Sequence, residues 1–141
     1  MSRGRILTDD NEIRTALRTA RTVAVVGMSP KPDRDSNRVG GYLMKRGYTV
    51  FPVRPAQREI LGARAYGRVT EIEEPVDIID VFRRADQIMP HVEEALTVRP
   101  AVFWMQLGIE HPEAAEALVS AGIDVVGNRC IKVEYERLIS R

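Results

Sequence analysis

The hydrophobic residues of this chain fall into five short runs that are apolar on successive positions rather than on alternate ones. The runs are Val23–Val26, Val50–Val53, Ile78–Val81, Ala101–Trp104 and Ile123–Val126. Short runs rich in β-branched and aromatic residues, without alternation, are typical of strands buried on both faces of a parallel sheet. The pattern therefore predicts five buried strands, although Pro52, Asp80 and Asp124 interrupt three of them.

Segments with helical periodicity separate most of these runs. Helices are predicted at Thr8–Thr19, from Ser36 to Arg46, from Asp86 to Val98 and from Pro112 to just before Gly122. Ser36 is a suitable N-cap, Gly47 a suitable helix end, and Pro112 a suitable first helical residue. Between Arg54 and Pro75 the periodicity is weaker and predicts a loop with one short helical turn.

Strands that alternate with helices connect through right-handed crossovers and give a parallel sheet that is covered on both faces. The sequence therefore predicts a three-layer α/β fold with a Rossmann-like, doubly wound sheet. Its five parallel strands are expected in the spatial order 3-2-1-4-5. A chain of 141 residues suffices for one core, so we expect a single domain over residues 1–141.

Composition narrows the class of protein. Charged residues make up 29% of the chain and the net charge is +1, so no overall field favours nucleic acid or an acidic membrane surface. No apolar run approaches the roughly 20 residues of a membrane helix. One cysteine, Cys130, excludes an internal disulfide and a multi-cysteine metal site. We therefore expect a cytoplasmic protein without a metal. The sequence leaves open whether the protein has a protein partner or forms a homo-oligomer.

The residues that follow the strands carry the candidate chemistry, because open parallel sheets bind ligands beyond the carboxyl ends of their strands. Gly27 allows a sharp turn after the first run and close approach of a ligand. Ser36 and the amides of residues 37–39 are expected to form a helix N-terminus that favours anions. Arg34 and Arg38 can add charge-assisted hydrogen bonds to a phosphate.

The residue after the second run bears on the choice of cofactor. NAD-binding sheets usually end this strand in Asp or Glu, which hydrogen-bonds the ribose hydroxyls. Here the residue is Arg54, with Arg58 nearby. A cation suits a phosphorylated ribose, so this position weighs against NAD and leaves NADP or a 3′-phosphorylated adenosine such as coenzyme A. The alternative is that Arg54 is an ordinary surface arginine.

Four sequence blocks carry a resemblance to a known family. They are V-A-V-V-G-M-S-P-K-P-D-R-D-S, D-I-I-D-V-F-R-R, V-F-W-M-Q-L-G and N-R-C-I-K-V-E, in this order along the chain. Together they resemble the small stand-alone CoA-binding domain proteins, a family similar to the CoA-binding domain of the succinyl-CoA synthetase α subunit. The resemblance covers about Leu7 to Glu136. It implies a Rossmann-like fold that binds coenzyme A or an acyl-CoA across the strand ends.

The resemblance also implies which residues contact the cofactor. Those expected to hold the phosphates and the adjacent ribose are Gly27, Ser29, Arg34, Ser36, Arg38 and Val39. Those expected beside the adenosine end are Val53, Arg54 and Pro55, and those bordering adenine and pantetheine are Phe82 and Arg83. The implied site is completed by Trp104, Gln106, Asn128 and Cys130. Trp104 in the core and Phe82 as a cap of the sheet are the structural alternatives.

Support for catalysis is weak in this sequence. His91 and His111 have no evident serine or cysteine partner, and we interpret them as surface or capping residues. Cys130 could exchange with CoA disulfides if its thiolate were stabilised, whereas a lone cysteine more often packs as a small hydrophobe. We therefore expect a non-catalytic module that binds CoA or acyl-CoA. A small NADP-dependent oxidoreductase and an acyl-CoA-sensing regulatory partner of a larger enzyme are the alternatives.

Overall fold

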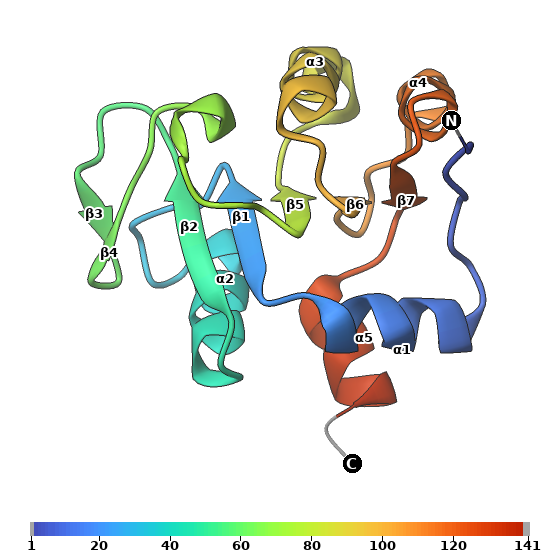
Figure 1. The fold of residues 1–141 in the computed structure, drawn as a ribbon. Coiled ribbons are helices and arrows are strands. Elements are labelled where there is room, and N and C mark those ends of the chain that lie inside the picture. Colours follow the sequence, from blue (N-terminus) through green and yellow to red (C-terminus); the bar gives the residue numbers. More distant parts are fainter. Residues whose placement is uncertain (1, 140–141) are drawn as a thin grey trace.

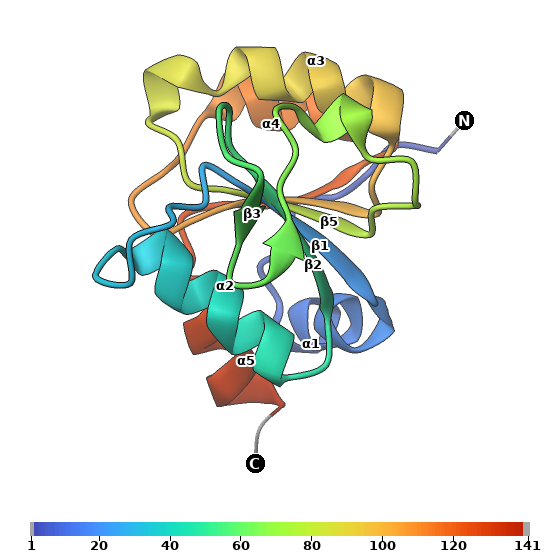
Figure 2. The same cartoon turned by 90° about the vertical axis from the view of Figure 1, so that its left-hand side faces the viewer.

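The computed structural model describes residues 2–139 and has one sheet of five parallel strands between two layers of helices (Figure 1 and Figure 2). The strands are β1 (Thr22–Val26), β2 (Thr49–Val53), β5 (Ile78–Val81), β6 (Val102–Met105) and β7 (Asp124–Val126). The helices are α1 (Asp10–Thr19), α2 (Asp35–Lys45), α3 (Met89–Val98), α4 (Pro112–Ser120) and α5 (Ile131–Leu138). Helices α3 and α4 cover one face, and α1, α2 and α5 cover the other. The predicted α/β class is confirmed.

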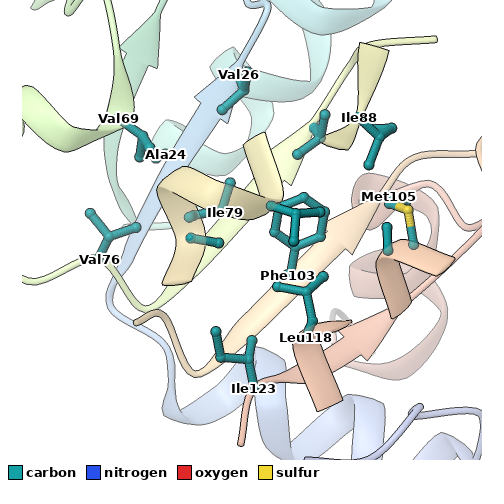
Figure 3. Close-up of a cluster of buried hydrophobic side chains, with 14 of the residues drawn as sticks. Ala24, Val26, Val69, Val76, Ile79, Ile88, Phe103, Met105, Leu118 and Ile123 are labelled. Atoms are coloured by element: carbon teal, nitrogen blue, oxygen red, sulfur yellow. The ribbon is translucent and has the colours of Figure 1, made fainter. Parts of the chain in front are cut away.

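Both faces of the sheet are packed, which explains why the strands are apolar on successive residues. Side chains leave a strand alternately, so neighbours in sequence enter opposite layers. Ala24, Ile79 and Phe103 lie in the cluster beneath α3 and α4 (Figure 3). Val25 and Trp104 belong to the cluster on the opposite face. Two separate cores therefore share one sheet.

The order of the strands differs from the one predicted. The sheet runs β2-β1-β5-β6-β7, which is 2-1-3-4-5 when only its own strands are counted, so the predicted order 3-2-1-4-5 is wrong. Pro52 gives the physical reason. Its carbonyl accepts a hydrogen bond from the amide of Tyr66 on the outer side of β2, 2.9 Å away, and its missing N–H lies on that same side. A strand with proline in this position suits an edge and not the interior place that the predicted order required.

Short chain segments cover both outer edges of the sheet. Tyr66 bridges Val53 along the edge of β2, and Ile6 bridges Val125 along the edge of β7. Unpaired strand edges invite association with other chains, and these single bridges shield them. Between β2 and β5 the chain also forms a small hairpin, β3 (Glu59–Ile60) with β4 (Ala63–Arg64), which the sequence did not predict. The predicted short helical turn is present as a 3-10 turn, η1 (Val69–Glu71).

One predicted helix is divided, and one helix was not predicted. The predicted helix that begins at Asp86 is divided, with a 3-10 turn η2 (Ala85–Gln87) before α3. Helix α5 was not predicted at all, although its residues Ile131, Tyr135 and Leu138 follow helical spacing. Among the helices of residues 2–139, none combines the length and the apolar character that crossing a membrane demands.

Candidate ligand site at the carboxyl ends of the strands

Gly27 makes the turn that joins β1 to the rest of the site. Its φ angle is +84°, and a Cβ atom at this position would lie 2.7 Å from the backbone oxygen of Phe82. Its amide donates to the carbonyl of Val53, 2.9 Å away at the end of β2. Only glycine fits both the positive φ and the close approach. The predicted sharp turn is confirmed, and it brings the ends of three strands together.

The loop after Gly27 is held by buried polar contacts. The amide of Ser29 donates to Oγ of Ser36 at 2.9 Å, and Nδ2 of Asn37 donates to the carbonyl of Ser29 at 2.9 Å. These three residues are all buried. Buried polar groups that find partners fix a single local conformation. The loop shape is therefore set by the protein itself, which lowers the entropy cost of binding a ligand there.

The start of α2 differs from the prediction in one respect. The N-cap residue is Arg34 and not Ser36, whose hydroxyl is already used by Ser29. The amides of Asn37 and Arg38 both donate to the carbonyl of Arg34, each at 3.1 Å. The expectation that amides 37–39 face a ligand is thus wrong, because they are taken up inside the helix. By helix geometry, the amides that lack an intrahelical acceptor are those of residues 35 and 36.

Cationic side chains surround this helix start. Arg38 donates to the carbonyl of Asp33 at 2.8 Å and forms an ion pair with the carboxylate of Asp35. The backbone carbonyl of Asp33 and the carboxylate of Asp35 therefore orient Arg38. Arg34 is exposed at the N-cap, and the aliphatic part of Arg83 passes close to Gly27, with Cδ 3.4 Å from where a Cβ of that glycine would be.

A groove of about 670 Å³ opens beside this helix start, and we call it the central groove. It is bounded by the first turns of α2, the loops 82–85 and 106–109, and the start of α5. The predicted site residues that line it are Arg38, Val39, Phe82, Arg83, Gln106 and Cys130. The structure adds Lys132 and Val133 of the unpredicted helix α5, together with Leu107. The size is ordinary for a small-molecule site.

The far wall of the central groove is fixed by Trp104 in β6 and by Gln106, which follows that strand. Oε1 of Gln106 accepts a hydrogen bond from the amide of Ile131 at 3.0 Å, so the first turn of α5 is tied to the end of β6. No hydrogen bond from the amide NH₂ of Gln106 is seen among residues 2–139, so this group can donate to a ligand. Trp104 is fully buried, and its indole nitrogen donates to the carbonyl of Arg129 at 2.8 Å. Trp104 thus holds the loop at Arg129 through this hydrogen bond and has no exposed surface for a ligand.

Other predicted site residues lie outside the central groove. Val53 is buried, Arg54 is half-buried and Pro55 is exposed, all after or within β2 on the far side of the Gly27 turn. The backbone amide of Arg54 donates to the carbonyl of Tyr66 at 2.7 Å, which anchors the chain where its side chain emerges. Asn128 adopts a positive φ of 55° and accepts a hydrogen bond from Gly108 through Oδ1 at 2.6 Å.

The histidines have structural contacts. Nδ1 of His111 accepts a hydrogen bond from the amide of Ala114 at 3.0 Å and caps α4, which confirms its interpretation as a capping residue. His91 is half-buried, and its Nδ1 lies 3.0 Å from Oε1 of Glu94. Within residues 2–139, no group of His, Cys, Asp and Glu side chains is arranged to hold a metal ion.

Asp80 is the unusual titratable group of the sheet. It lies in β5 and is completely buried, and neither carboxylate oxygen has a hydrogen-bond partner among the described residues. Burial raises its pKa well above the ordinary value, because the charged form loses its hydration. Asp80 therefore favours the protonated state inside the fold. The sequence marked it only as an interruption of an apolar run.

The fold and the site together define a class of protein. A parallel sheet with a ligand groove at its carboxyl edge, a glycine turn after β1 and arginines around a helix start is the arrangement of nucleotide-cofactor-binding α/β domains. A comparison with protein families goes further, because the CoA binding domain family matches residues 21–136. This chain belongs to that family, which confirms the resemblance seen in its sequence blocks.

Individual relatives agree with this assignment. The chain is 40% identical over 124 residues to the uncharacterised protein YneT of Bacillus subtilis (strain 168), a match that spans 88% of this chain and 92% of YneT. It is 32% identical over 121 residues to an ADP-forming acetate–CoA ligase of Archaeoglobus fulgidus, of which the match spans 18%. The solved structure of a Thermus thermophilus protein, cell-free ID.343, superposes with a TM-score of 0.90 at 44% identity, covering 94% of this chain and all of that one.

Proposed function

We propose that this protein binds coenzyme A, free or as a thioester, across the carboxyl ends of β2, β1, β5 and β6. We further propose that it acts as a binding module and does not turn the cofactor over. The observation that carries the proposal is the order of the chemical groups along the carboxyl edge of the sheet. An arginine follows β2, an arginine-rich helix start follows β1, and a groove with amide and apolar walls follows β5 and β6. Membership of the CoA binding domain family supports the same ligand.

The pyrophosphate of CoA is assigned to the start of α2. The amides of residues 35 and 36, which have no acceptor inside the helix, and the dipole of an eleven-residue helix favour an anion there. Arg34 and Arg38 supply charge, and Gly27 lets the ligand approach the backbone. Ser29, Ser36 and Val39 shape this part of the site through their buried contacts. Because Asp35 already pairs with Arg38, part of that arginine's charge is compensated, and the phosphates gain more from Arg34.

The adenosine end is assigned to the other side of the Gly27 turn. Arg54 would pair with the 3′-phosphate, and Val53 and Pro55 would lie beside the adenosine. Phe82 and Arg83 would border adenine and the beginning of pantetheine where the central groove opens. A charge-assisted hydrogen bond is worth about 1.5–3 kcal/mol, so the 3′-phosphate should raise affinity about tenfold to a hundredfold.

Pantetheine is assigned to the central groove. Its amides would meet the free NH₂ of Gln106, and its thiol end would reach the neighbourhood of Asn128 and Cys130. Trp104 is a positioning residue in this proposal, because it holds the carbonyl of Arg129 and thereby the loop that carries Cys130. The two histidines support a role without catalysis, since one caps a helix and the other pairs with Glu94.

Calorimetric titration with CoA, 3′-dephospho-CoA, NADP and NAD tests the proposal. CoA should bind about tenfold to a hundredfold more tightly than dephospho-CoA. Arg54→Ala should shrink this gap while changing dephospho-CoA little. Arg38→Ala should weaken both ligands alike, because both keep the pyrophosphate. Arg18→Ala, an exposed arginine on α1 outside the central groove, is the matched control and should change neither.

Three outcomes contradict parts of the proposal. Equal affinity for CoA and dephospho-CoA would remove the role of Arg54. Tighter binding of NADP than of CoA would favour the oxidoreductase alternative. Multiple turnover of a CoA thioester that depends on His111 or Cys130 would show that the protein is an enzyme.

A further inference from the structure

A second groove adjoins the central groove, and we call it the apolar groove. It has a volume of about 760 Å³ and lies at the ends of β6 and β7, between α4, α5 and the segment 6–8. Leu107, Cys130 and Val133 line both grooves, so the two adjoin along these side chains, beside the place proposed for the thiol of CoA. A ligand that follows the central groove past Cys130 therefore lies next to the apolar groove.

Exposed hydrophobic side chains are concentrated around this second groove. Among residues 2–139, five large hydrophobic side chains are exposed, and three of them, Ile6, Leu107 and Val133, line it. Their exposed fractions are 55%, 70% and 53%. A contiguous exposed apolar patch commonly marks a binding surface. The buried Met105 and Ala115 continue the same apolar wall toward α4.

Most polar residues of the apolar groove have partners within the protein, and the exposed Glu110 is the lining carboxylate for which no ion pair is seen among residues 2–139. Oδ1 of Asn128 accepts from Gly108 at 2.6 Å, and Nδ1 of His111 accepts from the first turn of α4. Arg129 pairs with Glu134 at 2.6 Å. Burial alone would raise the pKa of Glu134, but hydrogen bonds from Arg137 and Arg129 lower it below the ordinary value. These polar atoms already have partners within the protein, so the surface that remains for a ligand is mainly apolar.

We propose that the apolar groove takes the acyl chain of a CoA thioester, with the thioester itself near Cys130. This inference rests on the proposed binding of CoA in the central groove and extends it to a preference for thioesters with an aliphatic chain. The adjacency of the two grooves, which share Leu107, Cys130 and Val133, favours this occupant over an unrelated apolar ligand. A chain that leaves the thiol of CoA has its first methylenes at Leu107 and Val133.

Calorimetric titration of the wild-type protein with CoA and with its acetyl, butanoyl, hexanoyl and octanoyl thioesters tests this inference. Affinity should rise about two- to fourfold for each methylene that enters the groove, and then level off at the length that fills it. Ile6→Asp should remove most of this gain, because the exposed Ile6 lines only the apolar groove. Ala115→Leu should shorten the chain length at which the gain stops. Leu96→Asp, an exposed leucine on α3, is the matched control and should leave the gain intact.

The outcomes separate this inference from the function on which it rests. If free CoA does not bind, the proposed function fails. If free CoA binds and all thioesters bind with the same affinity, the acyl assignment is overturned while the proposed function stands. If the wild type instead self-associates and Ile6→Asp abolishes association without changing thioester preference, the apolar groove is a protein contact and the acyl assignment is equally overturned.

Discussion

The two halves of the carboxyl edge of this sheet expose different kinds of side chain. Around β1, β5 and α2, arginine side chains are exposed, while buried serine and asparagine contacts hold the loop beneath them. Around β6, β7 and α5, Arg129 pairs with Glu134, and three large hydrophobic side chains, Ile6, Leu107 and Val133, are exposed. The first half presents charge to solvent and the second presents apolar surface. Coenzyme A thioesters have the same polarity, from phosphates to acyl chain.

The comparison teaches that a single sheet edge can carry two chemistries when its strand order separates them. β5 lies between β1 and β6, so the loop after β5 is the boundary of the two halves. Phe82 and Arg83 belong to that loop. A ligand that spans the edge must cross this boundary, and a shorter ligand can use only one half.

Gly27→Ala should have the largest effect, because the new side chain would meet backbone atoms at the turn that builds the charged half. The new Cβ atom would lie 2.7 Å from the carbonyl of Phe82, at a φ of +84°. We expect the free energy of unfolding to fall by about 2–4 kcal/mol and CoA affinity to fall more than tenfold. Gly47→Ala is the control, since Gly47 has a φ of +100° with nothing within 4 Å, and should cost only about 1–2 kcal/mol. Urea denaturation and calorimetry measure both, and equal costs would refute the close-approach argument.

Asp80→Asn tests the buried strand β5, which lies beneath both halves. Burial raises the pKa of Asp80, so the folded protein binds a proton that the unfolded chain releases above its ordinary pKa. The stability of the wild type should therefore fall as pH rises from about 4 toward the folded pKa, by up to about 1.4 kcal/mol per pH unit. Asp80→Asn should lack this component, so its advantage over the wild type should grow with pH. Urea denaturation from pH 5 to 8 measures it, with Asp86→Asn, an exposed aspartate, as the control. Parallel curves for Asp80→Asn and the wild type would contradict a raised pKa.

Salt should separate the two halves without any mutation. The arginines of the charged half are exposed, so their attraction for phosphate is screened. Raising sodium chloride from about 50 to about 500 mM should weaken CoA about three- to tenfold. The additional affinity of octanoyl-CoA over CoA should stay constant or grow slightly, because apolar burial is not screened. If the additional affinity of octanoyl-CoA falls with salt as much as the affinity for CoA does, the two halves do not differ in their electrostatic character.

Trp104→Phe should have the smallest effect. It removes the indole donor to the carbonyl of Arg129 and should cost about 1 kcal/mol. The loop that carries Cys130 would loosen, so the additional affinity of octanoyl-CoA over CoA should decline. The ratio of the affinities for CoA and dephospho-CoA should not change. Tyr48→Phe removes a comparable hydrogen bond, from the phenol to the carbonyl of Leu17, away from both grooves. If the two variants lower the acyl-chain gain equally, Trp104 does not position the loop.

The sequence determined the strands and most of the helices of this protein, because their signals are local. An apolar run on successive residues indicates a strand buried on both faces, and that pattern survives in any strand order. The glycine turn after β1 and the family blocks were likewise local, and both were confirmed. Pro52 also held a local signal for the edge position of β2, which the prediction of strand order did not use.

Only the tertiary structure decided how distant residues share their hydrogen bonds. Ser36 became a partner of Ser29 instead of a helix cap, and Gln106 was tied to Ile131, 25 residues away. The burial of Asp80 and the adjacency of the two grooves at Cys130 depend on how the layers close over the sheet. Such contacts satisfy polar groups across the fold, and a partner that lies near only after packing leaves no periodic trace along the chain.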